Sequence, residues 1–190
     1  AKWHTVRNWI SQAERDFIRP AVGADLLLDL QEHHDNSDSD TALTEILDAA
    51  QRALALYAYY LAVPDLQLKM LDTGLHAMVD ETHKSATDSQ YGAYLEAQHN
   101  AAYSALDELY EVLHANVDSI PAWTNSQGYA GMTSSLFRTP QQFSAAYSIN
   151  NSSVTFVDIK PAILRAQDLV MRKELGAEFF DSLVEYVAGT

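Results

Sequence analysis

The sequence contains no cysteine, and this absence excludes disulfides, iron–sulfur clusters and zinc sites built from thiolates. It also lacks an uninterrupted apolar run long enough to span a membrane, and its N-terminal region has no apolar stretch of the kind found in signal peptides. We therefore expect a soluble protein without a membrane partner.

Basic residues are scarce as well. Lys and Arg number 12 against 26 Asp and Glu, which gives a net charge of -14, and Lys84 is the only basic residue between Met70 and Phe137. Proteins that bind nucleic acid tightly neutralise phosphates with Lys and Arg, so this composition argues against a DNA-reading role. The acidic residues indicate either a solvated face that keeps the protein soluble or a wall past which DNA moves without tight binding.

Hydrophobic residues make up 47% of the chain, and most of them recur at spacings of three and four. This period is typical of helices that bury one face, and 190 residues suffice to bury roughly two thirds of the unfolded surface. The sequence predicts a mainly α protein, a helical bundle with one small β-hairpin, in a single domain over residues 1–190.

The N-terminal region is repeated, loosely, near the C-terminus. A shift of 153 positions aligns residues 5–31 with residues 158–184, and most aligned pairs are identical or similar. The repeat of a helix, a glycine and a second helix predicts a duplicated helix-turn-helix hairpin at the two termini. The identical pairs are Ile10/Ile163, Ala13/Ala166, Arg19/Arg172, Gly23/Gly176, Ala24/Ala177 and Leu30/Leu183.

Within the first hairpin, we expect a helix over Thr5–Arg19 that Pro20 halts, and a second helix over Ala24–His33 after a turn at Gly23. The polar residues 33–40 predict a loop whose aspartates cap the next helix.

The middle of the chain predicts two long helices, Thr41–Val63, ended by Pro64, and Asp88–Ala115. Between them the apolar residues alternate, which favours a β-hairpin over Leu66–Val79. Further on, we expect an irregular stretch over 118–131, a short helix that Thr139 caps and Pro140 begins, and a proline, Pro161, near the start of the second copy or kinking it.

Two patterns imitate catalytic motifs. Asp72-Thr73-Gly74 follows two apolar residues as in aspartic proteases, but that chemistry needs a second aspartate in an all-β fold, so we interpret the segment as the hairpin turn. Glu96-x-x-His99 and Glu111-x-x-His114 imitate the pairs of di-iron bundles, yet they lie about 22 Å apart on one predicted helix and cannot share a metal pair.

Two further groups carry metal-ligand residue types. Residues 32–40 hold histidines and aspartates but lack the glycine and the terminal glutamate of a calcium loop. His76 and His83 flank two carboxylates without a recognised zinc spacing. The sequence therefore predicts no catalytic residue, no metal site and no cofactor.

Three stretches carry a resemblance. They are residues 13–27 (AERDFIRPAVGADLL), residues 70–86 (MLDTGLHAMVDETHKSA), and a run from IPAWTNSQGY at Ile120 through residues 143–183. Together they resemble an uncharacterised family of proteins encoded by tailed bacteriophages and prophages near the genes of the head-to-tail connector. The resemblance implies a virion structural part, similar to the helical adaptor proteins that form a ring beneath the portal, located in the virion neck and in the host cytoplasm during assembly.

The repeat and the resemblance together favour a head-to-tail connector or adaptor subunit that is not an enzyme. The expected partners are further copies of the chain in a ring and the portal or other neck proteins, with DNA passing without tight binding. The hairpin is expected to be either a protruding contact or folded onto the bundle, and Trp123 either anchors an interface or closes the core. The candidate interface residues are Leu68, Met70, Leu75, Trp123, Arg19 and Arg172.

An alternative of a different class stays open. In it, the chain is a metal-binding or enzymatic helical bundle that uses His76, His83, His99 or His114.

Overall fold

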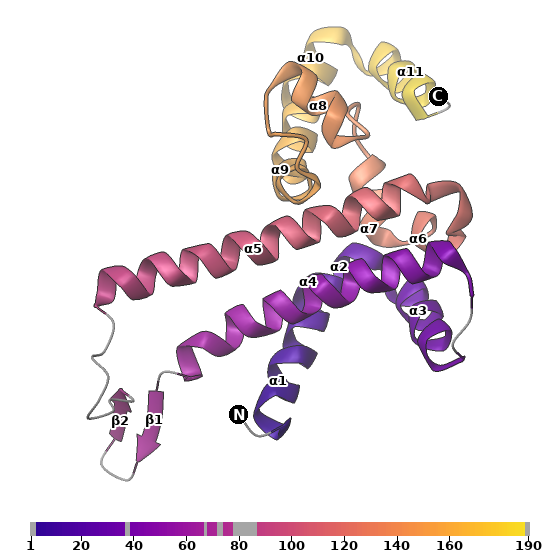
Figure 1. The fold of residues 1–190 in the computed structure, drawn as a ribbon. Helices are drawn as coiled ribbons and strands as arrows, with labels where there is room; N and C mark the ends of the chain where they lie inside the picture. Colours follow the sequence, from indigo (N-terminus) through magenta and orange to yellow (C-terminus); the bar gives the residue numbers. More distant parts are fainter. Residues whose placement is uncertain (1–2, 37–38, 67, 72–73, 78–86, 189–190) are drawn as a thin grey trace.

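A computed structural model describes residues 3–36, 39–66, 68–71, 74–77 and 87–188; the side chains of residues 3–5, 68–71, 74–77 and 188 lie outside this description. The fold is mainly α-helical, as the apolar spacing predicts. Two long helices, α4 (Thr41–Leu66) and α5 (Asp88–Ala115), run side by side through the centre of the molecule (Figure 1). The bounds predicted for α5 are confirmed.

The described chain begins with four consecutive helical segments, residues 3–36, that we call the N-terminal corner. It consists of α1 (Trp3–Ala13), a π-helical turn η1 (Glu14–Ile18), α2 (Arg19–Val22) and, after Gly23, α3 (Ala24–Asn36). All but α2 pack directly on α4.

After α5, a series of short elements leads to the end of the chain. They are η2 (Val117–Ser119), α6 (Pro121–Thr124), α7 (Gln127–Thr133) and α8 (Pro140–Ala146). The C-terminal corner, residues 153–188, then consists of α9 (Ser153–Ala166), a π-helical turn η3 (Gln167–Met171), α10 (Arg172–Leu175) and, after Gly176, α11 (Ala177–Ala188). In Figure 1 this corner lies on the opposite side of the α4/α5 pair from the N-terminal corner.

Two short strands, β1 (Leu68–Leu71) and β2 (Gly74–Ala77), lie beyond the end of α4 (Figure 1). They pair in antiparallel register, with Met70 opposite Leu75. The remaining residues of the predicted hairpin, 67, 72–73 and 78–79, lie outside the described part of the chain.

One apolar cluster holds the N-terminal corner, α4, α5 and α6 together. Apolar residues recur on the facing sides of these helices, so each helix buries a stripe against its neighbours. At the exposed edge of the α4/α5 contact, Arg52 forms a bidentate ion pair with Glu108 at 2.8 Å, which adds little stability because both side chains are solvated. The largest completely or nearly completely buried side chains are Trp123, Phe156, Ile18, Leu26, Leu30, Ile46, Leu109 and Leu113.

Several predicted caps are confirmed. The Thr139 hydroxyl accepts a hydrogen bond from the Gln142 amide and Pro140 begins α8, while an Asp40 carboxylate oxygen accepts one from the Leu43 amide at the start of α4.

Other predicted boundaries are wrong. Helical structure continues past Pro20 and Pro64, because a proline near a helix end removes only one backbone donor and the neighbouring turns hold the geometry. Of the two alternatives for Pro161, a place near the helix start is wrong, because Ser152 caps α9 earlier and Pro161 lies well inside that helix; the kink stays a prediction. The stretch 118–131 is largely helical rather than irregular, and α3 extends to Asn36.

Candidate functional site

The two corners have the same order of backbone elements. A π-helical turn, a short α-helix, a glycine and a further α-helix follow one another at a constant offset of 153 residues. The match extends to single hydrogen bonds, since the Arg19 amide donates to the Glu14 carbonyl and the Arg172 amide donates to the Gln167 carbonyl. π-helical turns are rare and frequently lie at functional sites, so their recurrence at equivalent positions identifies the corner as one structural unit used twice.

A glycine makes the sharp bend in each corner. Gly23 has φ 85° and ψ 165°, and Gly176 has φ 82° and ψ 147°. This region of backbone conformation is open almost only to glycine. The bend is therefore encoded in the same way at both ends of the chain.

The N-terminal corner is covered by the segment that follows α5. The Trp123 indole donates a hydrogen bond to the Ala21 carbonyl at 3.0 Å, and Trp123 is completely buried. A Cβ added at Gly23 would lie 2.7 Å from the Ser126 Cβ, and one added at Gly128 would lie 2.6 Å from the Pro20 carbonyl oxygen. The cover fits so closely that glycines are required on both sides of the contact.

The C-terminal corner packs through α9 on α5, α7 and α8, and further contacts hold the residues after α9. The Arg138 guanidinium donates to the Val187 carbonyl at 2.9 Å, the Gln167 side-chain oxygen accepts from the Leu136 amide at 2.8 Å, and Phe180 is buried beneath Arg172. At the glycine bend itself, a Cβ added at Gly176 would meet no atom within 4 Å.

Three pairs of equivalent apolar positions differ sharply in exposure. Ile18, Val22 and Leu26 belong to the core, whereas Met171, Leu175 and Phe179 lie at the surface; at a fourth pair the order is reversed, because Phe180 is buried and its equivalent Leu27 is only partly buried. We call Met171, Leu175 and Phe179 the C-terminal apolar face. The exposed fractions of these three equivalent pairs are Ile18 2% and Met171 38%, Val22 0% and Leu175 42%, and Leu26 0% and Phe179 60%.

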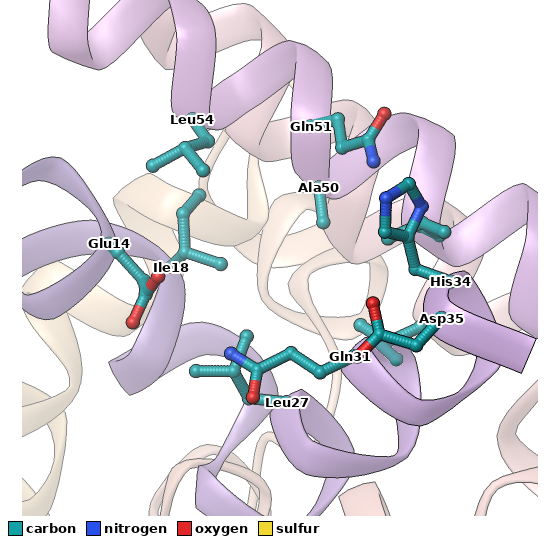
Figure 2. Close-up of a pocket in the computed structure, with 11 residues that line it drawn as sticks. Glu14, Ile18, Leu27, Gln31, His34, Asp35, Ala50, Gln51 and Leu54 are labelled. Carbon is teal, nitrogen blue, oxygen red and sulfur yellow. The ribbon is translucent and has the colours of Figure 1, made fainter. Parts of the chain in front are cut away.

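An open apolar groove of about 280 Å³ lies between α3 and α4, and we call it the α3/α4 groove (Figure 2). In Figure 2, Leu27 and Gln31 of α3 lie across from Gln51 and Leu54 of α4. Its lining contains two side chains that are charged at neutral pH, both acidic. The lining residues are Glu14, Ile18, Leu27, Leu30, Gln31, His34, Asp35, Leu47, Ala50, Gln51 and Leu54.

The predicted interface residues lie in three different environments. Arg19 and Arg172 occupy equivalent surface positions, where Arg19 lies 3.7 Å from Glu14 and Arg172 pairs with Asp181 at 3.0 Å. Trp123 was predicted either as an interface anchor or as a core residue, and the first alternative is wrong because its side chain has no exposed surface. Leu68, Met70 and Leu75 lie on β1 and β2, and their side chains fall outside the described part.

Of the four histidines of the alternative, the structure describes the side chains of His99 and His114, which lie fifteen residues apart on α5. Within the part of the chain that the structure describes, no three His, Asp or Glu side chains are close enough to hold a metal ion. His99 packs near Tyr60 and Tyr103 on the exposed middle of α5. His76 and His83 have side chains outside that part.

His114 differs from the exposed polar position expected of it. Its ring packs edge-on against Trp123 at a centroid distance of 5.1 Å, and its buried Nε2 has no hydrogen-bond partner among the described residues. Burial lowers the pKa of His114, because the imidazolium would lose its hydration there. His114 is therefore a half-buried residue that packs against Trp123 and whose neutral form burial favours.

Lys160 is a second buried titratable group, and no motif in the sequence singles it out. Its ammonium donates to the Met132 carbonyl, to the Ser135 hydroxyl at 2.6 Å and to the Phe137 carbonyl at 2.9 Å. Burial, with a contribution from nearby Arg138, lowers the pKa of Lys160 to about 8. Three acceptors satisfy the three ammonium protons, so Lys160 fastens the 132–137 segment to α9 and supports the C-terminal corner.

The chain belongs to a family whose function is not established. The Family of unknown function (DUF6712) matches residues 18–132, which is more than half of the chain. The match covers the α3/α4 groove and the cover of the N-terminal corner and stops short of the C-terminal corner. No curated protein and no solved structure gives a significant match. None of the described helices combines the length and apolar character needed to cross a membrane.

Proposed function

We propose that the protein is a virion structural protein, a head-to-tail connector or adaptor subunit that assembles with further copies into a ring against the portal. The observation that carries the proposal is the repeated corner, in which three apolar positions are buried at one end of the chain and exposed at the other. A subunit that assembles must present apolar surface while it is alone, and contiguous exposed apolar side chains mark such contacts.

Surface charge supports the same role. The exposed side of α5 carries Glu96, Glu108 and Glu111, and the chain as a whole carries a net charge of -14. Such a surface repels phosphates, so DNA moving through a ring of these subunits would not adhere to it. The resemblance to proteins of the head-to-tail connector region points in the same direction.

Within this proposal, the hairpin formed by β1 and β2 is a protruding contact for the portal or another neck protein. It lies beyond the end of α4 and away from both corners (Figure 1). Deletion of residues 67–77 is expected to preserve the far-ultraviolet circular dichroism spectrum and to abolish binding to the portal. Global unfolding of the deletion variant would show instead that the hairpin belongs to the bundle.

The decisive experiment mixes the purified protein with the portal ring encoded in the same genome. We expect the two to co-elute in size-exclusion chromatography, and electron microscopy to show added density on one end of the portal ring. The proposal would be refuted if the protein did not bind the portal and was absent from the neck of purified virions.

A further inference from the structure

A second cavity, of about 300 Å³, lies where η1, α4, α5 and α9 meet, and we call it the aromatic cavity. Its described lining residues differ from those of the α3/α4 groove. Four Phe and Tyr side chains line it, one from η1, one from α4 and two from α5. They are Phe17, Tyr57, Tyr103 and Tyr110. The rings of Phe17 and Tyr57 stack with their centroids 3.8 Å apart, which fixes one side of the cavity.

Two of these tyrosines are buried, yet their hydroxyl groups are not hydrogen-bonded. Tyr57 is 2% exposed and Tyr110 is 6% exposed, and neither hydroxyl has a hydrogen-bond partner among the described residues. Tyr103 differs, since its hydroxyl lies 2.8 Å from the Thr155 hydroxyl. Buried polar groups in proteins almost always have a partner, because an unpaired one costs free energy. The Tyr57 and Tyr110 hydroxyls are therefore available to a group that enters the cavity.

The lining residues that carry a full charge at neutral pH are acidic. Asp16 lies on η1 and Asp158 on α9, and the described lining contains no Lys or Arg. Asp16 pairs with the adjacent Arg15 at 2.8 Å. Asp158, in contrast, is exposed and has no ion-pair or hydrogen-bond partner among the described residues. Asp158 thus brings a negative charge to the cavity that no basic side chain compensates.

This negative charge acts on the tyrosine hydroxyls. Burial, followed by nearby Tyr103 and by the carboxylates of Asp158 and Asp107, raises the pKa of Tyr57 to about 12. Burial, followed by the same two carboxylates, also raises the pKa of Tyr110. Carboxylates that oppose the formation of a phenolate oppose any anion at this place and favour a cation.

The second copy of the corner shows that its backbone does not require these residues. At the offset of 153, Asp16 and Phe17 correspond to Leu169 and Val170, which lie in the same kind of π-helical turn and are exposed. The acidic and the aromatic side chain are thus specific to the copy that lines the cavity. π-helical turns frequently lie at functional sites, and here the turn places both side chains in the cavity.

We propose that the aromatic cavity binds an organic cation that carries N–H donors, either a protonated amine or a guanidinium group. The ring faces attract such a cation, Asp158 supplies the opposite charge, and the hydroxyl oxygens of Tyr57 and Tyr110 accept its hydrogen bonds. The volume lies at the lower end of the range for small-molecule sites, which suits a head group with a short alkyl chain. This site does not depend on the connector role.

Titration of the full-length protein with butylammonium at constant ionic strength tests the site. Isotope-labelled tyrosine gives ring signals in nuclear magnetic resonance spectra, and the signals of Tyr57 and Tyr110 are assigned by their loss in Tyr57→Phe and Tyr110→Phe. We expect butylammonium to shift these two signals along a saturable curve. Tetramethylammonium has no N–H group and should bind about fivefold more weakly, since it makes no hydrogen bond to the hydroxyls.

Substitutions separate a specific site from general attraction to an acidic chain. Asp158→Asn should weaken butylammonium binding about tenfold, through the loss of one charge-assisted hydrogen bond. Asp168→Asn removes an exposed carboxylate outside the cavity and is the matched control, with a change of less than about twofold.

Tyr110→Phe should weaken binding about fivefold and leave the midpoint of urea unfolding unchanged, because the hydroxyl has no partner in the fold. Tyr186→Phe, at an exposed tyrosine outside the cavity, should change neither quantity. A lower urea midpoint in Tyr110→Phe would show instead that the hydroxyl serves the fold, and would overturn its assignment to the ligand.

A free amine and a basic side chain of a partner protein present the same head group, and capped peptides distinguish them. If acetyl-Gly-Lys-Gly-amide or its arginine equivalent binds as tightly as butylammonium, the site takes a side chain of a partner. If only butylammonium binds, it takes a small amine. Unshifted signals of Tyr57 and Tyr110, or equal effects of Asp158→Asn and Asp168→Asn, would overturn the proposal. Equal binding of tetramethylammonium would overturn the assigned hydrogen bonds.

Discussion

The two glycine bends provide a matched pair of substitutions whose effects on stability should differ for a known reason. Gly23 and Gly176 have nearly the same φ and ψ, so alanine at either position forces a backbone conformation that costs about 1–3 kcal/mol. The surroundings differ, because a Cβ at residue 23 would lie 2.7 Å from the Ser126 Cβ and a Cβ at residue 176 would meet nothing within 4 Å.

Overpacking adds to the cost at only one of the two bends. The atom in the way at Gly23 is a Cβ, which cannot move without its backbone, and forced overpacking of this kind costs about 1–3 kcal/mol. We therefore expect Gly176→Ala to lower the free energy of unfolding by about 1–3 kcal/mol and Gly23→Ala by about 2–6 kcal/mol. Urea unfolding, followed by circular dichroism and by tryptophan fluorescence, measures both.

Ser126→Gly isolates the clash. It removes the obstructing Cβ and loses the hydroxyl that caps α7, a change that costs only a few tenths of a kcal/mol when glycine is the replacement. In a double-mutant cycle, Ser126→Gly should restore about 1–3 kcal/mol to Gly23→Ala and nothing to Gly176→Ala. Equal losses at the two glycines, or no recovery with Ser126→Gly, would refute the assigned packing of the N-terminal corner.

Three further predictions concern buried polar groups. The pKa of Lys160 is about 8 in the folded protein and 10.5 in the unfolded chain, so the unfolded state binds more protons between these two pH values. The free energy of unfolding should therefore rise with pH across this window, and Lys160→Met should abolish the rise. The pKa of His114 is lowered from 6.5, so stability should fall as the pH drops below 6.5, and His114→Phe should flatten that fall in acid titrations of the melting temperature. Trp123→Phe should lower the free energy of unfolding in urea by about 2–4 kcal/mol, because it leaves the Ala21 carbonyl without its donor and opens a void; a loss below about 0.5 kcal/mol would contradict the contact.

Local signals in the sequence were sufficient for much of the fold. The capped and periodic segment of α5 was predicted to the residue, and Thr139 with Pro140 identified the start of α8. Helix ends depend on capping side chains that lie within one turn of the backbone groups to which they hydrogen-bond. Short stretches of sequence are therefore enough to predict them.

The π-helical turns were not predictable from residue type. The first, Glu14–Ile18, ends two residues before Pro20, and the second, Gln167–Met171, ends two residues before Lys173. Proline therefore cannot be the cause of the wider turn. A π-helical turn adds one residue at a single place, and one insertion is too short to set a period in the sequence.

Exposure was the other property that the sequence could not supply. Ile18 and Met171 occupy the same place in the same apolar pattern, yet one is buried and the other lies at the surface, because only tertiary contacts decide which copy receives a cover. The α3/α4 groove was missed for the same reason, since residues of η1, α3 and α4 form it together. Comparison of the two copies identifies the candidate surface. A position that is buried in one copy and exposed in the other indicates a surface that is free in the isolated chain and available for a contact.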